Sequence, residues 1–108
     1  MQGLQKEIKN TFFQTLEDLK TRENFETFFH DFLDQNELQV LIKRLAIAYW
    51  LKKGRNNENI KNNIGVNDKE IEEIKLKIHK KGYKLAVKLM EAEEWANVWS
   101  EKIKKIVK

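Results

Sequence analysis

The feature that most constrains the fold is a pair of short amphipathic segments on either side of one glycine. Isoleucines recur at helical spacing on both sides of Gly65, with Ile60 and Ile64 before it and Ile71 and Ile74 after it. This spacing predicts two short helices packed across a tight turn. Glycine suits such a turn because it adopts positive φ without a Cβ penalty.

The residues after the glycine also favour this turn. Val66 is the expected apolar plug between the two helices. Asn67 can cap the second helix, and Glu70, three residues later, completes a capping-box pattern. Together these features predict a helix-turn-helix over residues 55–81. A plain helical hairpin that ends in a glycine gives the same spacing, so that alternative stays open.

Composition favours one all-α domain. The chain has 108 residues, no proline, four glycines and no cysteine. Helix-forming residues dominate such a composition. Without cysteine, neither a disulfide framework nor a thiolate zinc site is available. There is no signal-peptide pattern and no apolar run of membrane-spanning length, so we expect a cytoplasmic protein with no membrane partner.

Charge is unevenly distributed along the chain. Residues 1–36 hold four basic and seven acidic residues, a net charge of −3, and residues 37–108 carry +7 within the total of +4. A basic C-terminal two-thirds suits a polyanion such as DNA. Lysine-rich helices that are merely solvated would have the same composition.

Residues 1–53 are expected to form N-terminal dimerisation helices. The first helix carries an apolar stripe at Leu4, Ile8, Phe12, Leu16 and Leu19. Four phenylalanines follow after the expected N-cap, Thr21, at positions 25, 28, 29 and 32. The first stripe is interpreted as a core or dimer contact. The phenylalanines are interpreted as packing residues rather than as a ligand pocket, because phenylalanine buries a large area and has no polar group.

A third helix is expected from Glu37 to Lys53, with Asn36 as its cap and Gly54 ending it. It is apolar nearly all round, which is typical of a central helix. Arg44 lies among its apolar residues. It is either a structural arginine paired with an acidic residue or the anchor for a small carboxylate.

Gly82 interrupts the pattern, and residues 83–107 read as one long C-terminal helix. Its stripe includes Leu85, Leu89 and Trp99, with Trp95 close to it. We expect this helix to serve packing or dimerisation.

These segments together resemble the Trp repressor superfamily, most closely its YerC/YecD-type branch. The resemblance covers about residues 12 to 82 and rests on Phe12-Phe13-Gln14-Thr15-Leu16, Phe28-Phe29-His30-Asp31, Asn36-Glu37-Leu38, Arg44-Leu45-Ala46-Ile47-Ala48 and Gly65-Val66. It implies a six-helix all-α fold, an intertwined homodimer and two helix-turn-helix heads that bind operator DNA.

The recognition helix departs from the family pattern. It begins Asn67-Asp68-Lys69-Glu70, and Glu73 stands where the family carries an arginine. In the tryptophan-binding members that arginine also lines the corepressor pocket, so Glu73 argues against tryptophan as the ligand. Arg44 matches the family's other corepressor arginine. No cofactor is expected, and a small-molecule corepressor other than tryptophan stays open.

The candidate DNA-binding residues lie along both short helices. They are Arg55, Asn56, Asn57 and Lys61 around the first helix, and Asn67, Asp68, Lys69, Glu70, Lys75 and Lys77 on the second. Lysine, arginine and helix N-termini bind phosphate regardless of sequence. Asn67 and Lys69 are the expected base readers, and Asp68 and Glu70 could accept from cytosine N4.

Catalytic patterns are nearly absent. The chain has one serine, Ser100, and two histidines, His30 and His79, without metal-ligand spacing. We therefore expect no enzyme and no metal site. The sequence predicts a sequence-specific DNA-binding transcriptional regulator, a repressor acting as a homodimer. The alternative is a dimeric helical interaction protein that kept this fold and lost DNA binding.

Overall fold

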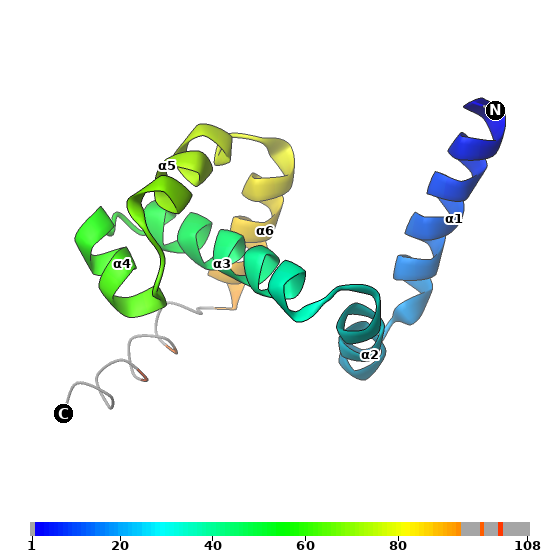
Figure 1. The fold of residues 1–108 in the computed structure, drawn as a ribbon, viewed down its shortest axis with the longest axis horizontal. Coiled ribbons are helices and arrows are strands. Elements are labelled where there is room, and N and C mark those ends of the chain that lie inside the picture. The colour runs from blue at the N-terminus through cyan, green and yellow to red at the C-terminus, as the bar shows by residue number, and fades with distance from the viewer. Residues whose placement is uncertain (1, 94–97, 99–101, 103–108) are drawn as a thin grey trace. The chain divides into compact units, whose positions relative to one another are not determined.

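The described part of the chain is entirely helical (Figure 1). The computed structural model describes residues 2–93 together with residues 98 and 102. Within them the elements are α1 (Gln2–Leu19), α2 (Arg22–Phe32), α3 (Gln35–Lys52), α4 (Asn57–Ile64), α5 (Asp68–Lys77) and α6 (Lys81–Ala92). The predicted all-α fold of six helices is confirmed, and no described helix is long and apolar enough to cross a membrane.

The chain divides into two compact units, Met1–Leu38 and Gln39–Lys108. The boundary falls in the first turn of α3. The single domain with an internal division after residue 53 stays a prediction. The buried residues of α3 all lie in its second half, within the second unit.

The first unit is a pair of helices joined by a short turn. Lys20 adopts a left-handed conformation with φ 62°. Thr21 caps α2, as predicted, because its side chain accepts a hydrogen bond from the Asn24 amide at 3.1 Å. The Asn24 side chain donates to the Leu19 carbonyl at 2.9 Å. These contacts satisfy backbone groups that would otherwise be orphaned at the two helix ends.

Phenylalanine rings are the main apolar contacts of this unit. The rings of Phe12 in α1 and Phe28 in α2 lie 6.5 Å apart, and Phe28 stacks on Phe32 at 4.1 Å. No residue of α1 or α2 is buried. The exposed apolar side chains include Leu4, Ile8, Phe12, Phe13, Phe25 and Phe32.

Helix α3 has clear signals at both ends. Asp34 Oδ1 accepts from the Glu37 amide at 2.7 Å, and the Asp34 amide donates to Glu37 Oε1 at 3.0 Å. The prediction that Asn36 caps this helix is therefore wrong. Asp34 has the capping-box spacing to Glu37, and Asn36 does not. At the other end the Arg55 amide donates to the Trp50 carbonyl, with Gly54 at φ 82°, as predicted for a glycine-terminated helix.

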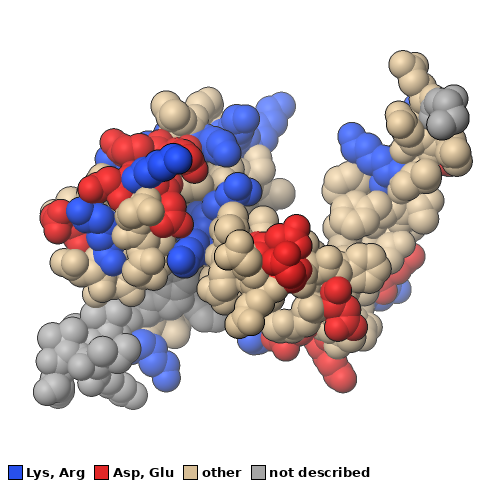
Figure 2. All heavy atoms as spheres, viewed as in Figure 1, with Lys and Arg blue, Asp and Glu red and all other residues tan. Residues whose placement is uncertain are grey.

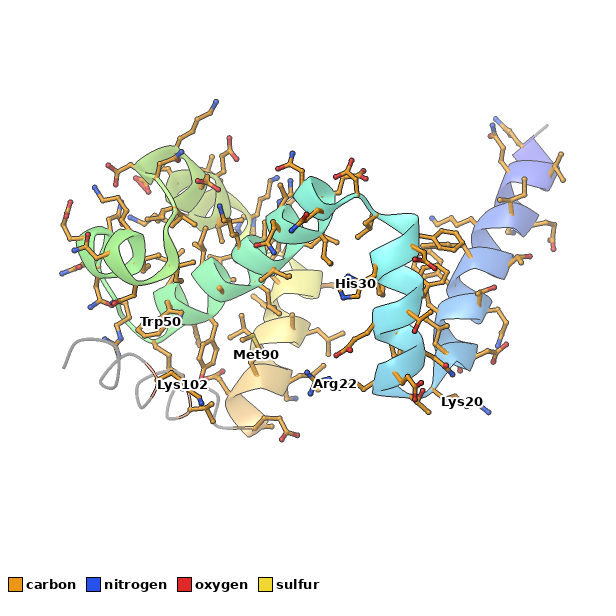
Figure 3. All side chains as sticks on the ribbon, turned by 60° about the horizontal axis from the view of Figure 1, so that its bottom comes forward. Lys20, Arg22, His30, Trp50, Met90 and Lys102 are labelled. Atoms are coloured by element: carbon orange, nitrogen blue, oxygen red, sulfur yellow. The ribbon has the colours of Figure 1, made fainter. Side chains whose placement is uncertain are left out.

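All buried core residues that the structure describes lie in the second unit. It contains Ile47, Ala48, Tyr49, Trp50, Ile60, Val66, Ile71, Ile74, Val87 and Met90. In Figure 3, Trp50 lies toward the C-terminal end of α3 and Met90 lies on α6. Four consecutive residues of α3 are buried, so neighbours surround this turn on every side. The predicted central role of the third helix holds for its second half.

Helix α6 differs from its prediction at both ends. It begins at Lys81, so Gly82 lies inside its first turn, where the sequence predicted a break. Its last residue is Ala92. Of the predicted helix over residues 83–107, only Val98 and Lys102 are described beyond Glu93, and Trp95 and Trp99 lie outside the described residues.

Candidate nucleic-acid interface

Helices α4 and α5 form the predicted helix-turn-helix. Gly65 ends α4 in the left-handed conformation, with φ 76° and ψ 43°, and its amide donates to the Lys61 carbonyl at 3.0 Å. Apart from Gly65 itself and its two chain neighbours, no heavy atom lies within 4 Å of the place where a Cβ would stand at Gly65. The backbone conformation, and not crowding, therefore requires glycine there. Val66 is 8% exposed and forms the predicted plug between the helices.

The start of α5 is held by the predicted capping box. Asn67 Oδ1 accepts from the Glu70 amide at 2.8 Å, and the Asn67 amide donates to Glu70 Oε1 at 3.1 Å. Ile71 and Ile74 anchor the same helix in the core. The carboxylate of Glu70 and the side-chain oxygen of Asn67 are therefore already used locally. The side-chain nitrogen of Asn67, Nδ2, is still available as a hydrogen-bond donor.

Lys61 joins the two helices through an ion-pair cluster. Its Nζ lies 2.8 Å from Glu58 Oε1 in α4 and 3.1 Å from Asp68 Oδ2 in α5. Asn57 Nδ2 donates to the other Asp68 oxygen at 3.3 Å. Three predicted DNA contacts, Asn57, Lys61 and Asp68, are thus brought together, but they contact one another.

The cluster shifts the protonation of both charged partners. The hydrogen bonds of Lys61 with Glu58 and then with Asp68 raise the pKa of its ammonium group above 10.5. The hydrogen bonds from Lys61 and then from Asn57 lower the pKa of the Asp68 carboxyl below 3.8. Each charge favours the ionised form of the other. The positive charge of Lys61 is already compensated, and its side chain is only 25% exposed.

Two further predicted DNA-binding residues have local structural roles. The Arg55 guanidinium lies 4.2 Å from the centre of the Trp50 ring, and its Nη1 donates to Asn59 Oδ1 at 3.4 Å. The Asn56 side chain caps α4 by accepting from the Asn59 amide at 2.9 Å. Both residues therefore fix the start of α4 and its approach to the end of α3.

The remaining candidates lie along α5. Lys69 is exposed in its first turn, and Lys77 is partly buried near its end. Lys75 Nζ lies 3.1 Å from Glu72 Oε2. Glu73 is exposed. Figure 2 shows basic and acidic side chains interspersed over α4 and α5 on the face turned to the viewer.

A hollow of about 410 Å³ lies beside Arg44. Its walls come from α3 and α6 and include Leu41, Leu45, Tyr83 and Lys80. Among the described residues, Arg44 belongs to no salt bridge, so the interpretation as a paired structural arginine finds no partner there. Glu73 does not line this hollow. No group of three or more acidic or histidine side chains in the described ranges could hold a metal.

The family match spans the helix-turn-helix and the helices that precede and follow it. The family description "Trp repressor protein" matches residues 7–92 of this chain. The chain belongs to the Trp repressor family. The Trp repressor family consists of DNA-binding helix-turn-helix regulators and not of enzymes, which supports the DNA-binding interpretation of α4 and α5. The narrower placement in the YerC/YecD branch stays a prediction. No curated protein and no solved structure matches the chain.

Sequence reasoning missed the ion-pair cluster. Glu58 stands three residues before Lys61, a spacing that places both on one helical face and could have been noticed. The contact of Lys61 with Asp68 crosses the turn, and only the angle between α4 and α5 creates it. The same holds for Arg55 and Trp50, which meet because the chain reverses after Gly54.

Proposed function

We propose that this protein is a sequence-specific DNA-binding repressor that acts as a homodimer. The turn from α4 to α5 carries this proposal. Its glycine is left-handed, its valine plug is buried, and α5 begins with a complete capping box. Helix α5 is proposed to enter the major groove of DNA, with α4 across the backbone.

The acidic start of α5 is the main objection, and the local contacts weaken it. Asp68 is neutralised by Lys61, Glu70 is held in the capping box, and Glu72 pairs with Lys75. These carboxylates also suit the positive end of the helix dipole. Glu73 is left as the exposed carboxylate without a partner among the described residues.

Lys69 is the proposed primary DNA contact of α5. It is exposed in the first turn, where recognition helices approach base edges. The side-chain amide of Asn67 lies two residues before Lys69 and can donate to a base or a phosphate. Lys75 and Lys77 are proposed to contact phosphates from the later turns.

The first unit supports the homodimer. Helices α1 and α2 bury no residue, although both carry apolar stripes. Ile8 is 60% exposed and Phe32 is 70% exposed. A pair of helices with so much apolar surface is stabilised when a second surface covers it. A second copy of the chain is the proposed cover.

The hollow beside Arg44 is the proposed site of a small-molecule corepressor. Its guanidinium is available for a carboxylate, and Leu41, Leu45 and Tyr83 supply an apolar wall. Tryptophan is not the proposed ligand, because Glu73 replaces the pocket arginine that the tryptophan-binding members carry, and its position does not line this hollow, so α5 supplies no second arginine to face Arg44.

The proposal is tested by binding of the purified protein to a fragment from upstream of its own gene. A scrambled fragment of equal composition and a salt series serve as references. We expect sequence-preferring binding that weakens steeply with salt. Lys69→Ala should weaken binding roughly tenfold or more. Lys9→Ala in α1 removes the same charge from a residue outside the helix-turn-helix and should leave affinity nearly unchanged.

The alternative, a helical interaction protein without DNA binding, is favoured by the compensated charge of Lys61 and by exposed Glu73. No binding of either DNA fragment at low salt by folded protein would establish that alternative. Equal affinity for both fragments would refute sequence-specific binding but would leave non-specific DNA binding in place. Unchanged affinity in Lys69→Ala, with specific binding intact, would instead refute only the proposed docking of α5.

A further inference from the structure

A larger hollow, of about 580 Å³, lies among α3, the end of α5 and α6. Leu51, Ile78 and Val87 contribute its apolar lining, and Val87 is almost completely buried. It shares no lining residue with the hollow beside Arg44. Its volume falls in the range of roughly 300–1,000 Å³ that is usual for small-molecule sites.

Lysines surround this apolar lining. Lys84 and Lys88 lie one turn apart on α6, and Lys52 lies in the last turn of α3. None of the three forms a salt bridge with any residue that the structure describes. Like charges four residues apart destabilise a helix, so Lys84 and Lys88 oppose helix formation unless an anion lies between them.

Among the described lining residues, one carboxylate is present, and it is already compensated. Glu91 Oε2 lies 3.2 Å from Lys53 Nζ, and Lys53 is outside the lining. His79, on the connection between α5 and α6, adds imidazole nitrogens to the lining. The lysines without a described salt bridge therefore favour an anionic group, and the apolar lining favours a hydrocarbon part of the same ligand molecule.

The identity of the cations narrows the class of anion. Arginine presents a planar fork that matches a carboxylate, whereas lysine acts as a point charge and binds phosphate well. This hollow contains lysines and no arginine, in contrast to the hollow beside Arg44. Several ammonium groups also suit a dianion better than a monoanion. We propose that this hollow binds a small organic phosphate with an apolar body.

The site is placed to sense the end of α5. Ile78 is the C-cap of α5, and its amide donates to the Ile74 carbonyl at 2.8 Å. His79 follows in the connection to α6. A ligand that contacts Ile78, His79 and Lys84 bridges α5 to α6. Binding should therefore slow amide hydrogen exchange at residues 78 and 79, whether or not the protein binds DNA.

The test uses phenyl phosphate as the probe and calorimetric titration of the full chain. The pocket variant Lys84→Gln/Lys88→Gln is compared with Lys9→Gln/Lys81→Gln, which removes equal charge outside the hollow. We expect the pocket variant to bind phenyl phosphate roughly tenfold more weakly or worse, and the control to bind as wild type. Benzoate and inorganic phosphate should each bind wild type more weakly, because each lacks one half of the recognised chemistry.

Three results would overturn the proposal. They are no binding of phenyl phosphate at millimolar concentration, equal loss in both double variants, and equal affinity for phenyl phosphate and inorganic phosphate. Equal loss would show that overall charge attracts the anion. Weaker DNA binding by the pocket variant, with no binding of phenyl phosphate, would assign these lysines to the DNA backbone instead.

Discussion

Helices α1 and α2 carry apolar stripes as regular as those of α4 and α5, but their burial is opposite. No residue of α1 or α2 is buried, whereas Ile60, Ile71 and Ile74 are at most 3% exposed. The two pairs of helices have similar turns, since both second helices begin with a side-chain cap. The difference lies in what covers them, because α3 and α6 complete the core of the second unit.

The comparison separates two uses of an amphipathic helix. In the second unit the apolar face of α5 is buried against other helices of the same chain. The polar face of α5 is therefore available for the proposed recognition of DNA. In the first unit the apolar face stays exposed and is available to another chain. Apolar periodicity predicts that one face of a helix will be buried, but it does not predict whether the same chain or a second chain buries it.

The largest expected effect comes from an isoleucine substitution in each unit. Ile71→Ala should lower the free energy of unfolding by about 2–5 kcal/mol, because Ile71 is fully buried. Ile8→Ala should leave the unfolding of the second unit unchanged and weaken self-association about tenfold, since Ile8 belongs to the proposed dimer surface. Denaturant titration and sedimentation equilibrium measure the two effects. A wild-type protein that is folded and monomeric would refute the proposal that α1 and α2 form a dimer surface.

An intermediate effect is expected from the glycines of the second unit. Gly65→Ala should lower the free energy of unfolding by about 1–2 kcal/mol, because alanine resists the left-handed conformation that Gly65 adopts. Gly82→Ala is the matched control. Gly82 lies in the first turn of α6 without positive φ, so alanine should be neutral or stabilising by up to about 1 kcal/mol. Equal destabilisation by both changes would contradict the role given to the turn.

The smallest effect on stability is expected from Asp68→Asn, which breaks the contact between α4 and α5. Because the folded pKa of Asp68 is lowered, its contribution is complete above pH 3.8 and is lost as the pH falls through the folded value. Wild type and variant should therefore converge in acid. The raised pKa of Lys61 gives the reverse dependence, with its contribution complete below pH 10.5 and lost as the pH rises through the folded value.

The same variant should bind DNA more tightly, because it removes a negative charge from α5 and leaves Lys61 with Glu58 as its one remaining ion-pair partner among the described residues. Glu73→Gln is the control, since it removes one carboxylate from α5 without breaking a described ion pair. It should also tighten DNA binding, but it should not change stability in acid. Binding isotherms and urea titrations at several pH values distinguish these outcomes. If Asp68→Asn weakened DNA binding, the acidic group would have to be a DNA contact.

Much of the local structure followed from the sequence. Gly54, Gly65, Thr21, Asn67 and Glu70 predicted helix ends correctly, because a left-handed glycine or a side-chain cap depends on a few neighbouring residues. The error at Asn36 was also local, because Asp34 is the residue with the correct spacing to Glu37. The buried positions of α4 and α5 were equally predictable from their period.

The sequence by itself determined the helical class, the helix-turn-helix and the family. Only the tertiary structure decided which charges compensate one another, because Lys61 and Asp68 meet through the angle between two helices and not through a sequence spacing. The tertiary structure also decided that Phe25 and Phe32 of α2 stay exposed while Tyr49 and Trp50 are buried. Burial depends on surfaces that come from distant parts of the chain, and a local pattern does not contain them.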